Sequence, residues 1–186
     1  MGEMVKQDSS ELSVSLVVPL LNEAKVISQL FDDLSKTECD EIIIVDGGST
    51  DGSWEQLESM QSVFDSTKPN IRIVQSECGR AKQMNYGAQL SQGEIIVFLH
   101  ADTRLPKNAS KALMQMRDSG RFWGRFDVRF PRDAPSGFAM SVIAFFINMR
   151  SRLSGIATGD QAIFVNSNLF REINGYMELP LSLIHI

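Results

Sequence analysis

Acidic and polar side chains recur at regular intervals in the first hundred residues, each time directly after an apolar segment. Residues 19–23 read Pro-Leu-Leu-Asn-Glu, residues 46–51 read Asp-Gly-Gly-Ser-Thr-Asp, and residues 100–103 read His-Ala-Asp-Thr. Carboxylates that gather in one place repel one another unless a cation or a donor-rich ligand lies among them. If the fold brings these three segments together, their chemistry suits a divalent metal ion or a hydroxyl-rich ligand.

Four of these side chains have distinct candidate roles. Asp46 can accept hydrogen bonds from a nucleobase N–H or from ribose hydroxyls, or it can act as a turn or helix-cap residue, the role that we favour for Asp51. Asp102 suits Mg²⁺ or Mn²⁺, because such ions take one or two carboxylates together with substrate phosphates. His100 is either a second metal ligand, a hydrogen-bond partner of a phosphate, or a structural side chain.

The segment 79–85, Gly-Arg-Ala-Lys-Gln-Met-Asn, is expected to open a helix. Backbone N–H groups at a helix N-terminus, together with Arg80 and Lys82, can meet a diphosphate; the alternative is a solvated helix start. No G-x-G-x-x-G follows the first apolar segment and no G-x-x-x-x-G-K-[ST] occurs anywhere in the sequence. Their absence disfavours dinucleotide-binding and P-loop proteins.

Apolar runs alternate with amphipathic segments through the first two thirds of the chain. The spacing predicts strands at 14–18, 41–45, 71–74 and 94–99, and helices at 27–34, 54–64, 81–90 and from Pro106 onward. Alternation of this kind predicts a mostly parallel sheet with helices on both faces. Ligands of such sheets bind beyond the carboxyl ends of the strands, where the three polar segments fall.

The last third of the sequence has a different character. Residues 121–130 alternate between apolar and charged types, which predicts a strand, and a loop at 131–137 separates it from an apolar helix at 138–153 and a short helix at 166–173. The strand either faces an anionic acceptor or is a solvated edge strand. The apolar helix either touches a membrane surface, which would suit a lipid-linked acceptor, or packs in a core or subunit interface.

Composition narrows the class of protein. A chain of 186 residues suggests one domain, and its net charge of −5 argues against a nucleic-acid partner. Cys39 and Cys78 form no metal-type spacing, residues 1–11 are polar without a signal-like apolar core, and the apolar stretch 138–149 is shorter than the ~20 residues of a membrane span. We therefore expect a cytoplasmic protein, with peripheral contact at the inner face of the membrane left open.

In this order, the motifs resemble glycosyltransferase family 2, and most of all its branch called rSAM/selenodomain-associated transferase 2. The matching segments are 17–19 with 22–23, 45–52, 79–85, 98–103, 159–165 and Gly175-Tyr176. The resemblance implies a GT-A (Rossmann-like) fold that is incomplete in its C-terminal part. It implies a polar tail at 1–12, a family domain at 13–181 with a nucleotide-sugar half (13–105) and an acceptor-side half (106–181), and a non-native tail at 182–186.

The resemblance also implies transfer of a sugar from a UDP- or GDP-linked donor to an acceptor hydroxyl, with inversion and with Mg²⁺ or Mn²⁺. Asp102 matches the last carboxylate of the family's D-x-D motif, whose first position is His100 here, and both are candidate metal ligands. The candidate donor-binding residues are Pro19, Asn22, Glu23, Asp46, Gly48, Ser49, Arg80, Gln83, Asn85 and Ala101.

The general base is less well defined. The family's acidic E-D type motif is expected shortly after Gly175-Tyr176, but residues 177–181 read Met-Glu-Leu-Pro-Leu. We interpret the chain as truncated, with Asp160 as the remaining candidate base and a catalytically incomplete nucleotide-sugar-binding module as the alternative function. A nucleotidyltransferase is disfavoured, because residues 19–23 lack the glycine-rich, basic first loop of that class.

Overall fold

The computed structural model describes residues 12–64, 69–130, 137–157 and 161–178. Most of the expected N-terminal tail and all of the expected non-native tail lie outside the described residues, at 1–11 and 179–186. The strands are β1 (Val14–Leu20), β2 (Glu41–Asp46), β3 (Asn70–Gln75), β4 (Ile95–Phe98), β5 (Trp123–Arg125) and β6 (Ile163–Asn166). The helices are α1 (Ile27–Leu34), α2 (Ser53–Phe64), α3 (Arg80–Leu90), α4 (Ala109–Asp118), α5 (Gly137–Ser154) and α6 (Ser167–Glu172).

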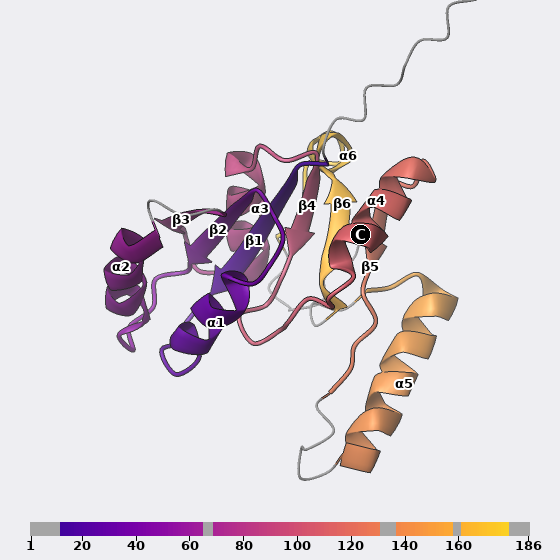
Figure 1. Cartoon of the computed structure of the whole chain (residues 1–186), viewed down its shortest axis with the longest axis horizontal. Helices are drawn as coiled ribbons and strands as arrows, with labels where there is room; N and C mark the ends of the chain where they lie inside the picture. Colours follow the sequence, from indigo (N-terminus) through magenta and orange to yellow (C-terminus); the bar gives the residue numbers. More distant parts are fainter. Residues whose placement is uncertain (1–11, 65–68, 131–136, 158–160, 179–186) are drawn as a thin grey trace, which may run out of the picture.

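One six-stranded sheet, in the order β3-β2-β1-β4-β6-β5, organises the chain (Figure 1). β1 pairs in parallel with β2 and β4, and β2 pairs in parallel with β3, whereas β6 runs antiparallel to both β4 and β5. Every residue of β2 and β4 is buried, which explains why these strands are continuous apolar runs rather than alternating ones. The structure therefore confirms the predicted mostly parallel α/β sheet.

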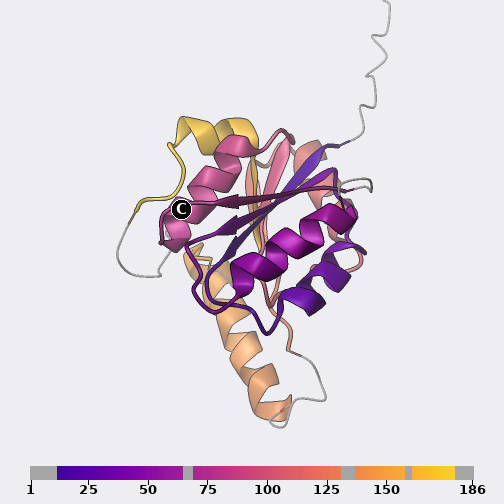
Figure 2. The ribbon, with the colours of Figure 1, turned by 90° about the vertical axis from the view of Figure 1, so that its left-hand side faces the viewer.

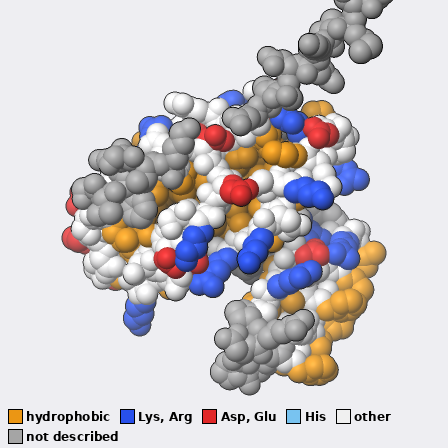
Figure 3. Space-filling view, viewed as in Figure 1, with side chains coloured by type: hydrophobic (Ala, Val, Ile, Leu, Met, Phe, Trp, Pro, Cys, Tyr) orange, Lys and Arg blue, Asp and Glu red, His pale blue; other side chains and the backbone are white. Residues whose placement is uncertain are grey.

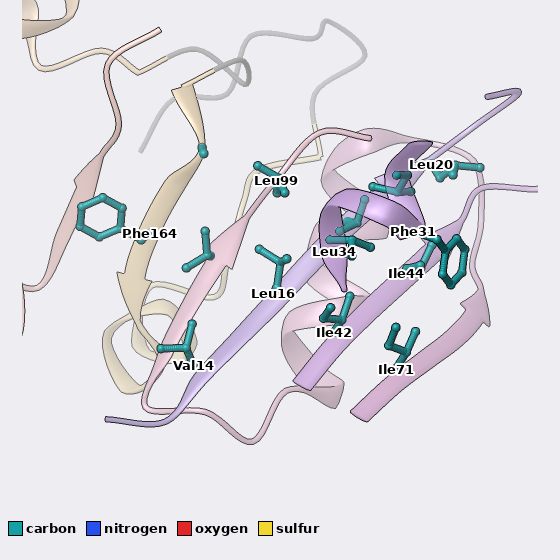
Figure 4. Close-up of a cluster of buried hydrophobic side chains, with 14 of the residues drawn as sticks. Val14, Leu16, Leu20, Phe31, Leu34, Ile42, Ile44, Ile71, Leu99 and Phe164 are labelled. Atoms are coloured by element: carbon teal, nitrogen blue, oxygen red, sulfur yellow. The ribbon is translucent and has the colours of Figure 1, made fainter. Parts of the chain in front are cut away.

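Helices cover both faces of this sheet, and each face has its own core. Figure 2 shows α1 and α2 on one side and α3 on the other. On the first side, the four apolar residues that recur at helical spacing in α1 are all buried against β1 and β2 (Figure 4): Ile27, Leu30, Phe31 and Leu34. On the other side, Met84 and Ala88 of α3 pack with Phe170 of α6. Burial of that apolar surface stabilises the sheet and fixes the strand ends that carry the candidate site.

The direction of the winding reverses between β1 and β4. From β1 the chain passes outward through β2 to β3, and α3 then returns it to β4 on the other side of β1. A reversal of this kind leaves a crevice outside the carboxyl ends of the two strands, where open α/β sheets bind their ligands. The loops that follow β1 and β4 lie at this reversal.

The first strand continues past the predicted stop at Pro19, as far as Leu20. A proline lacks the N–H that a central strand normally donates. The pairing of β4 with β1 covers only Val14–Val17, and the carbonyl of Val17 accepts from Leu99 N at 2.9 Å. Alternate residues of a strand direct their backbone groups to the same side, so the nitrogen of Pro19 faces the same side as the backbone of Val17, toward β4. The pairing with β4 has already ended there, and no hydrogen bond from the nitrogen of Pro19 is needed.

Two other predicted elements differ from the structure, and one strand was missed. The predicted strand at 121–130 pairs only over Trp123–Arg125, as the edge strand β5, where it lies against Ile163–Val165 of β6. β6 itself was not predicted. A turn in which Ala109 N donates to Pro106 O at 2.9 Å precedes α4, so that helix begins at Ala109 rather than at Pro106.

Candidate functional site

The polar segments that follow β1, β2 and β4 meet at one edge of the sheet. Leu20 is level with Asp46 in the parallel pairing of β1 and β2, and Val17 is level with Phe98 in the pairing of β1 and β4. β4 therefore ends three residues below the level of Asp46, and the turn that holds Ala101 and Asp102 follows it. Neighbouring strands are ~4.8 Å apart, so β2 and β4, separated by β1, are on the order of 10 Å apart across the sheet.

The loops after β1 and β2 are joined by side chain to backbone hydrogen bonds. Asn22 N donates to Ser49 Oγ at 2.8 Å, and Thr50 N donates to Asn22 Oδ1 at 2.8 Å. The next residue of the first loop continues this pattern: Glu23 N donates to Ser53 Oγ at 2.9 Å. Asn22 adopts φ 55°, a left-handed conformation that asparagine tolerates better than most residues. Together these bonds make the two loops a single, pre-shaped rim.

Asp46 organises this rim from within. Its side chain is fully buried, and its Oδ2 accepts from Gly48 N and Ser49 N, both at 3.0 Å. Its Oδ1 accepts from Ser49 Oγ, the same hydroxyl that receives Asn22 N. The sequence allowed either a ligand-binding role or a turn role for Asp46. These bonds give it the turn role, because its carboxylate accepts from the backbone N–H groups of Gly48 and Ser49 within its own loop.

Asp51 links the second loop to the first, in addition to capping the start of α2. Its Oδ2 accepts from Ala24 N at 3.0 Å, and its Oδ1 accepts from Ser53 N at 3.0 Å and from Ser53 Oγ. The bond from the Ser53 hydroxyl, followed by that from Ala24 N, lowers the pKa of Asp51 below its usual 3.8. The sequence indicated only the cap; the Ser-Thr-Asp-Gly-Ser pattern was the available signal for the link.

The link through Asp51 is expected to weaken in acid. Its pKa is depressed in the folded chain, so the stabilisation is present above pH ~4 and is lost as the pH falls through the folded pKa. As the pH falls from about 6 through the lowered pKa of Asp51, the protection factors of the Ala24 and Ser53 amide protons, measured by NMR and corrected for intrinsic exchange, should therefore fall. The amide of Leu169, which donates to the uncharged Asn166 Oδ1, is the control and should keep its protection. Unchanged protection at Ala24 would contradict this role for Asp51.

Gln83, a predicted donor-binding residue, holds the strand ends in place. Its side chain is 3% exposed, and Nε2 donates to Leu20 O at 2.7 Å and to Val45 O at 2.9 Å. A Cβ at Gly47 would lie 2.9 Å from Gln83 Cδ, so the glycine allows this close approach. One buried amide therefore joins the first turn of α3 to the carboxyl ends of β1 and β2.

The same hydrogen bonds bring the N-terminus of α3 to the rim. Arg80, the first residue of α3, is exposed, as expected of a side chain that meets an anionic ligand. Lys82 is paired with Glu77, Nζ to Oε2 at 2.5 Å, and this hydrogen bond raises the pKa of Lys82. The free backbone N–H groups of the helix start and Arg80 thus give this part of the rim a positive electrostatic character.

Asn85, also predicted to bind the donor, contacts the segment that follows α6. Its Nδ2 donates to Tyr176 O at 2.9 Å, and Tyr176 N donates to its Oδ1 at 2.8 Å. A Cβ at Gly175 would lie 2.5 Å from Asn85 Oδ1, which explains the glycine there. The ring of Tyr176 packs edge-on against Phe98, with centroids 5.0 Å apart. The Gly-Tyr pair of the sequence motif therefore attaches the end of the described chain to α3 and β4.

Asp102 and His100 lie in the turn after β4, with different exposure. The carboxylate of Asp102 is exposed, and its Oδ1 accepts from Thr103 Oγ1 at 3.2 Å. The side chain of His100 is buried, and Ala101 between them packs partly against the core. Within the described parts of the chain, no group of three or more His, Cys, Asp or Glu side chains could hold a metal ion. One accessible carboxylate does fit an ion that takes most of its ligands from phosphate and water.

The other predicted donor-binding residues are half-buried or exposed. Pro19 is half-buried within β1, Glu23 is half-buried in the first loop, and Gly48 is exposed at the rim. Asp160, the candidate base, lies outside the described residues. The structure thus gathers the other predicted residues at one edge, but it gives Gln83 and Asn85 protein partners rather than exposed amides.

With this geometry established, comparison with known proteins defines the class. The model of glycosyl transferase family 2 matches residues 15–172, and the chain belongs to that family. Over 94 residues it is 34% identical to the glycosyltransferase alr2836 of Nostoc sp., covering 49% of this chain and 28% of the relative. Over 108 residues it is 30% identical to glycosyltransferase GlyG of Streptococcus pneumoniae, covering 57% of this chain and 35% of that protein. The matched region thus spans about a third of these relatives.

Solved structures of glycosyltransferases share the fold. The mannosyltransferase PcManGT of Pyrobaculum calidifontis, in complex with GDP-Man and Mn²⁺, superposes with a TM-score of 0.73 at 21% identity, over 94% of this chain and 50% of that one. TarS 1–349 of S. aureus, in complex with UDP-GlcNAc, superposes with a TM-score of 0.66 at 19% identity, over 92% and 51%. The expected GT-A, Rossmann-like architecture is confirmed.

Among the described residues, no helix is both long and apolar enough to cross a membrane.

Proposed function

We propose that the whole protein is a glycosyltransferase that moves a sugar from a nucleoside-diphosphate donor to an acceptor hydroxyl, with inversion at the anomeric carbon. The observation that carries this proposal is the pre-shaped rim of residues 21–24 and 46–53, which shares the carboxyl edge of the parallel strands with the exposed carboxylate of Asp102. The separation of roughly 10 Å across the sheet between β2 and β4 suits a ligand the size of a nucleoside diphosphate. Similarity to enzymes solved with GDP-Man or UDP-GlcNAc supports the same donor class.

In this proposal the rim receives the nucleoside. Asn22, Glu23, Gly48 and Ser49 border it, while the buried carboxylate of Asp46 keeps the loop in shape instead of contacting the base directly. Gln83 and Asn85 act as positioning residues, Gln83 for the strand ends under the rim and Asn85 for the end of the described chain. Residues 13–105 would form the nucleotide-sugar half and residues 106–181 the acceptor-side half.

The diphosphate would lie between the start of α3 and Asp102. Arg80 and the free N–H groups of α3 stabilise the negative charge that develops on the leaving diphosphate. Asp102, with His100 behind it as a further candidate, would hold Mg²⁺ or Mn²⁺, and the bound ion would neutralise the same charge as a Lewis acid. Similarity to two transferases solved with Mn²⁺ supports a divalent ion.

On the acceptor side, the incoming hydroxyl must lose a proton to a base within reach. Asp160 is our proposed base, and it precedes Gln161, which is buried at the start of the segment leading into β6. The position of the motifs further suggests the rSAM/selenodomain-associated transferase 2 branch of the family.

Titration calorimetry with a panel of UDP- and GDP-sugars, with and without Mn²⁺, tests the proposed function. We expect one donor to bind, and to bind more tightly with Mn²⁺. Absence of binding to every donor would overturn the proposal. Donor binding without transfer or hydrolysis, in a chain extended to the full length of its relatives, would instead favour the binding-module alternative.

A further inference from the structure

Helix α5 is attached to the rest of the chain by polar groups, and its large apolar side chains are exposed. This is the reverse of an ordinary surface helix, which buries its apolar face. Asn148 Oδ1 accepts from Val128 N at 2.9 Å, and its Nδ2 donates to Val128 O at 3.0 Å. Arg125 donates through Nη2 to the carbonyl of Asn148 at 3.2 Å, and Arg152 pairs with Asp127. In Figures 1 and 2 the helix extends beyond the body of the protein.

The outward side of α5 is a continuous apolar face. Its side chains recur at intervals of three and four, so that they form stripes along the helix. Phe138 is 86% exposed, Phe145 60% and Leu153 82%. The face consists of Phe138, Val142, Ile143, Phe145, Phe146, Met149 and Leu153. At 1.5 Å per residue, the face is ~23 Å long from Phe138 to Leu153, and exposed patches of this kind mark interaction sites.

The surroundings of this face are basic, although the chain as a whole carries a net charge of −5. The sequence of α5 contains no Asp or Glu, and the described residues 119–130 and 137–157 contain five arginines against one aspartate. Arg125 and Arg152 pair with that aspartate, Asp127, and these three side chains line a cavity of about 560 Å³ with Arg121, between α4, β5 and α5. Arg129 and Arg150 are exposed. Figure 3 shows blue basic side chains beside the orange apolar surface at the lower right.

We infer that α5 lies in the surface of an anionic phospholipid bilayer, with its apolar face among the acyl chains and the arginines at the headgroup phosphates. An apolar face flanked by cations is the pattern of helices that lie in a membrane interface, and each basic residue adds attraction to anionic lipid. α5 is among the described helices, none of which is both long and apolar enough to cross a membrane, so the inferred contact of α5 is with the bilayer surface. A second copy docked through the same face would bring like charges together, which disfavours that partner.

Vesicle sedimentation of the full chain tests this inference independently of any transferase activity. Vesicles of phosphatidylcholine alone are compared with vesicles of equal parts phosphatidylcholine and phosphatidylglycerol. We expect binding to the mixed vesicles that weakens as salt rises. The double substitution Phe145→Ser/Phe146→Ser should lower the partition coefficient by at least about tenfold, because two large apolar side chains no longer leave water.

Matched variants separate the apolar and the electrostatic parts. Met114→Ser/Ile173→Ser removes two other exposed apolar side chains and should leave binding unchanged. Arg129→Gln/Arg150→Gln should weaken binding to the mixed vesicles several-fold. Lys107→Gln/Lys111→Gln, which removes two exposed cations just before and within the first turn of α4, should not. Failure to bind the mixed vesicles, binding that survives the double phenylalanine substitution, or a dimer that the same substitution dissolves would overturn the inference.

Discussion

Replacing Asp102 with alanine is expected to reduce Mn²⁺-dependent affinity for the nucleotide-sugar donor by at least about a hundredfold, and transfer by more. The carboxylate is exposed at the tip of β4, and within the described residues no larger cluster of metal-ligating side chains could take its place. An ion that depends on one carboxylate and on phosphate should be lost from the protein when that carboxylate is removed. Calorimetry with and without Mn²⁺ measures the loss.

The fold should survive this substitution, because Asp102 is exposed and removing its bond from Thr103 Oγ1 changes little. Asp118→Ala is the matched control: it removes another exposed carboxylate, at the end of α4, and should leave donor affinity and its Mn²⁺ dependence unchanged. If Asp102→Ala bound the donor with undiminished Mn²⁺ dependence, the metal would have to be held elsewhere. The proposed roles of Asp102 and His100 would then be abandoned.

The elements nearest the strand reversal were the most predictable from sequence. Strands buried on both faces are near-continuous apolar runs, so Glu41–Val45 was recognisable to within one residue of β2. The edge strand β3 alternates between buried and more exposed residues, and Ile71–Val74 was also recognisable to within one residue at each end. The apolar residues of α1 recur at helical spacing, and all four are buried. Because parallel strands end at a common edge, the sequence also predicted that the three polar segments would meet.

The elements beyond β4 depend on distant partners and were harder to predict. The alternation of residues 121–130 suggested a ten-residue strand, but only Trp123–Arg125 finds a ladder partner in β6. Further along, Asn148 of α5 takes both backbone groups of Val128, in place of a neighbouring strand. The short apolar run of β6 is equally compatible with a helix and with a strand. In the structure it forms a strand because it pairs antiparallel with β4.

The roles of single side chains at the site were the least predictable. From sequence, Gln83 and Asn85 belong to a helix start that faces an anionic ligand. In the structure their amides bond to backbone groups 63 and 91 residues away in sequence, at Leu20 and Tyr176. No local pattern encodes such a separation. A motif in sequence can therefore mark residues that position a site as well as residues that touch its ligand.

Replacing Gln83 with leucine is expected to destabilise the protein by roughly 1–3 kcal/mol, because the carbonyls of Leu20 and Val45 both lose the hydrogen bond from the buried amide. The carbonyl of Leu20 keeps its bond from Gly47 N at 2.9 Å. Leucine has a similar volume, so the cost reflects lost hydrogen bonds more than a cavity. The rim after β1 and β2 should also loosen, which would weaken donor binding by about tenfold or more even where the variant is folded. Urea unfolding monitored by circular dichroism gives the stability, and calorimetry gives the affinity.

The same helix supplies the control for this experiment. Gln89, two turns further along α3, is exposed, and Gln89→Leu should change the free energy of unfolding by less than about 0.5 kcal/mol. If Gln83→Leu lost affinity for the donor without losing stability, the amide would contact the ligand directly, as the sequence had suggested. If stability and affinity fell together, the buried amide would act as inferred here: it sets the height of two strand ends, and the strand ends shape the rim.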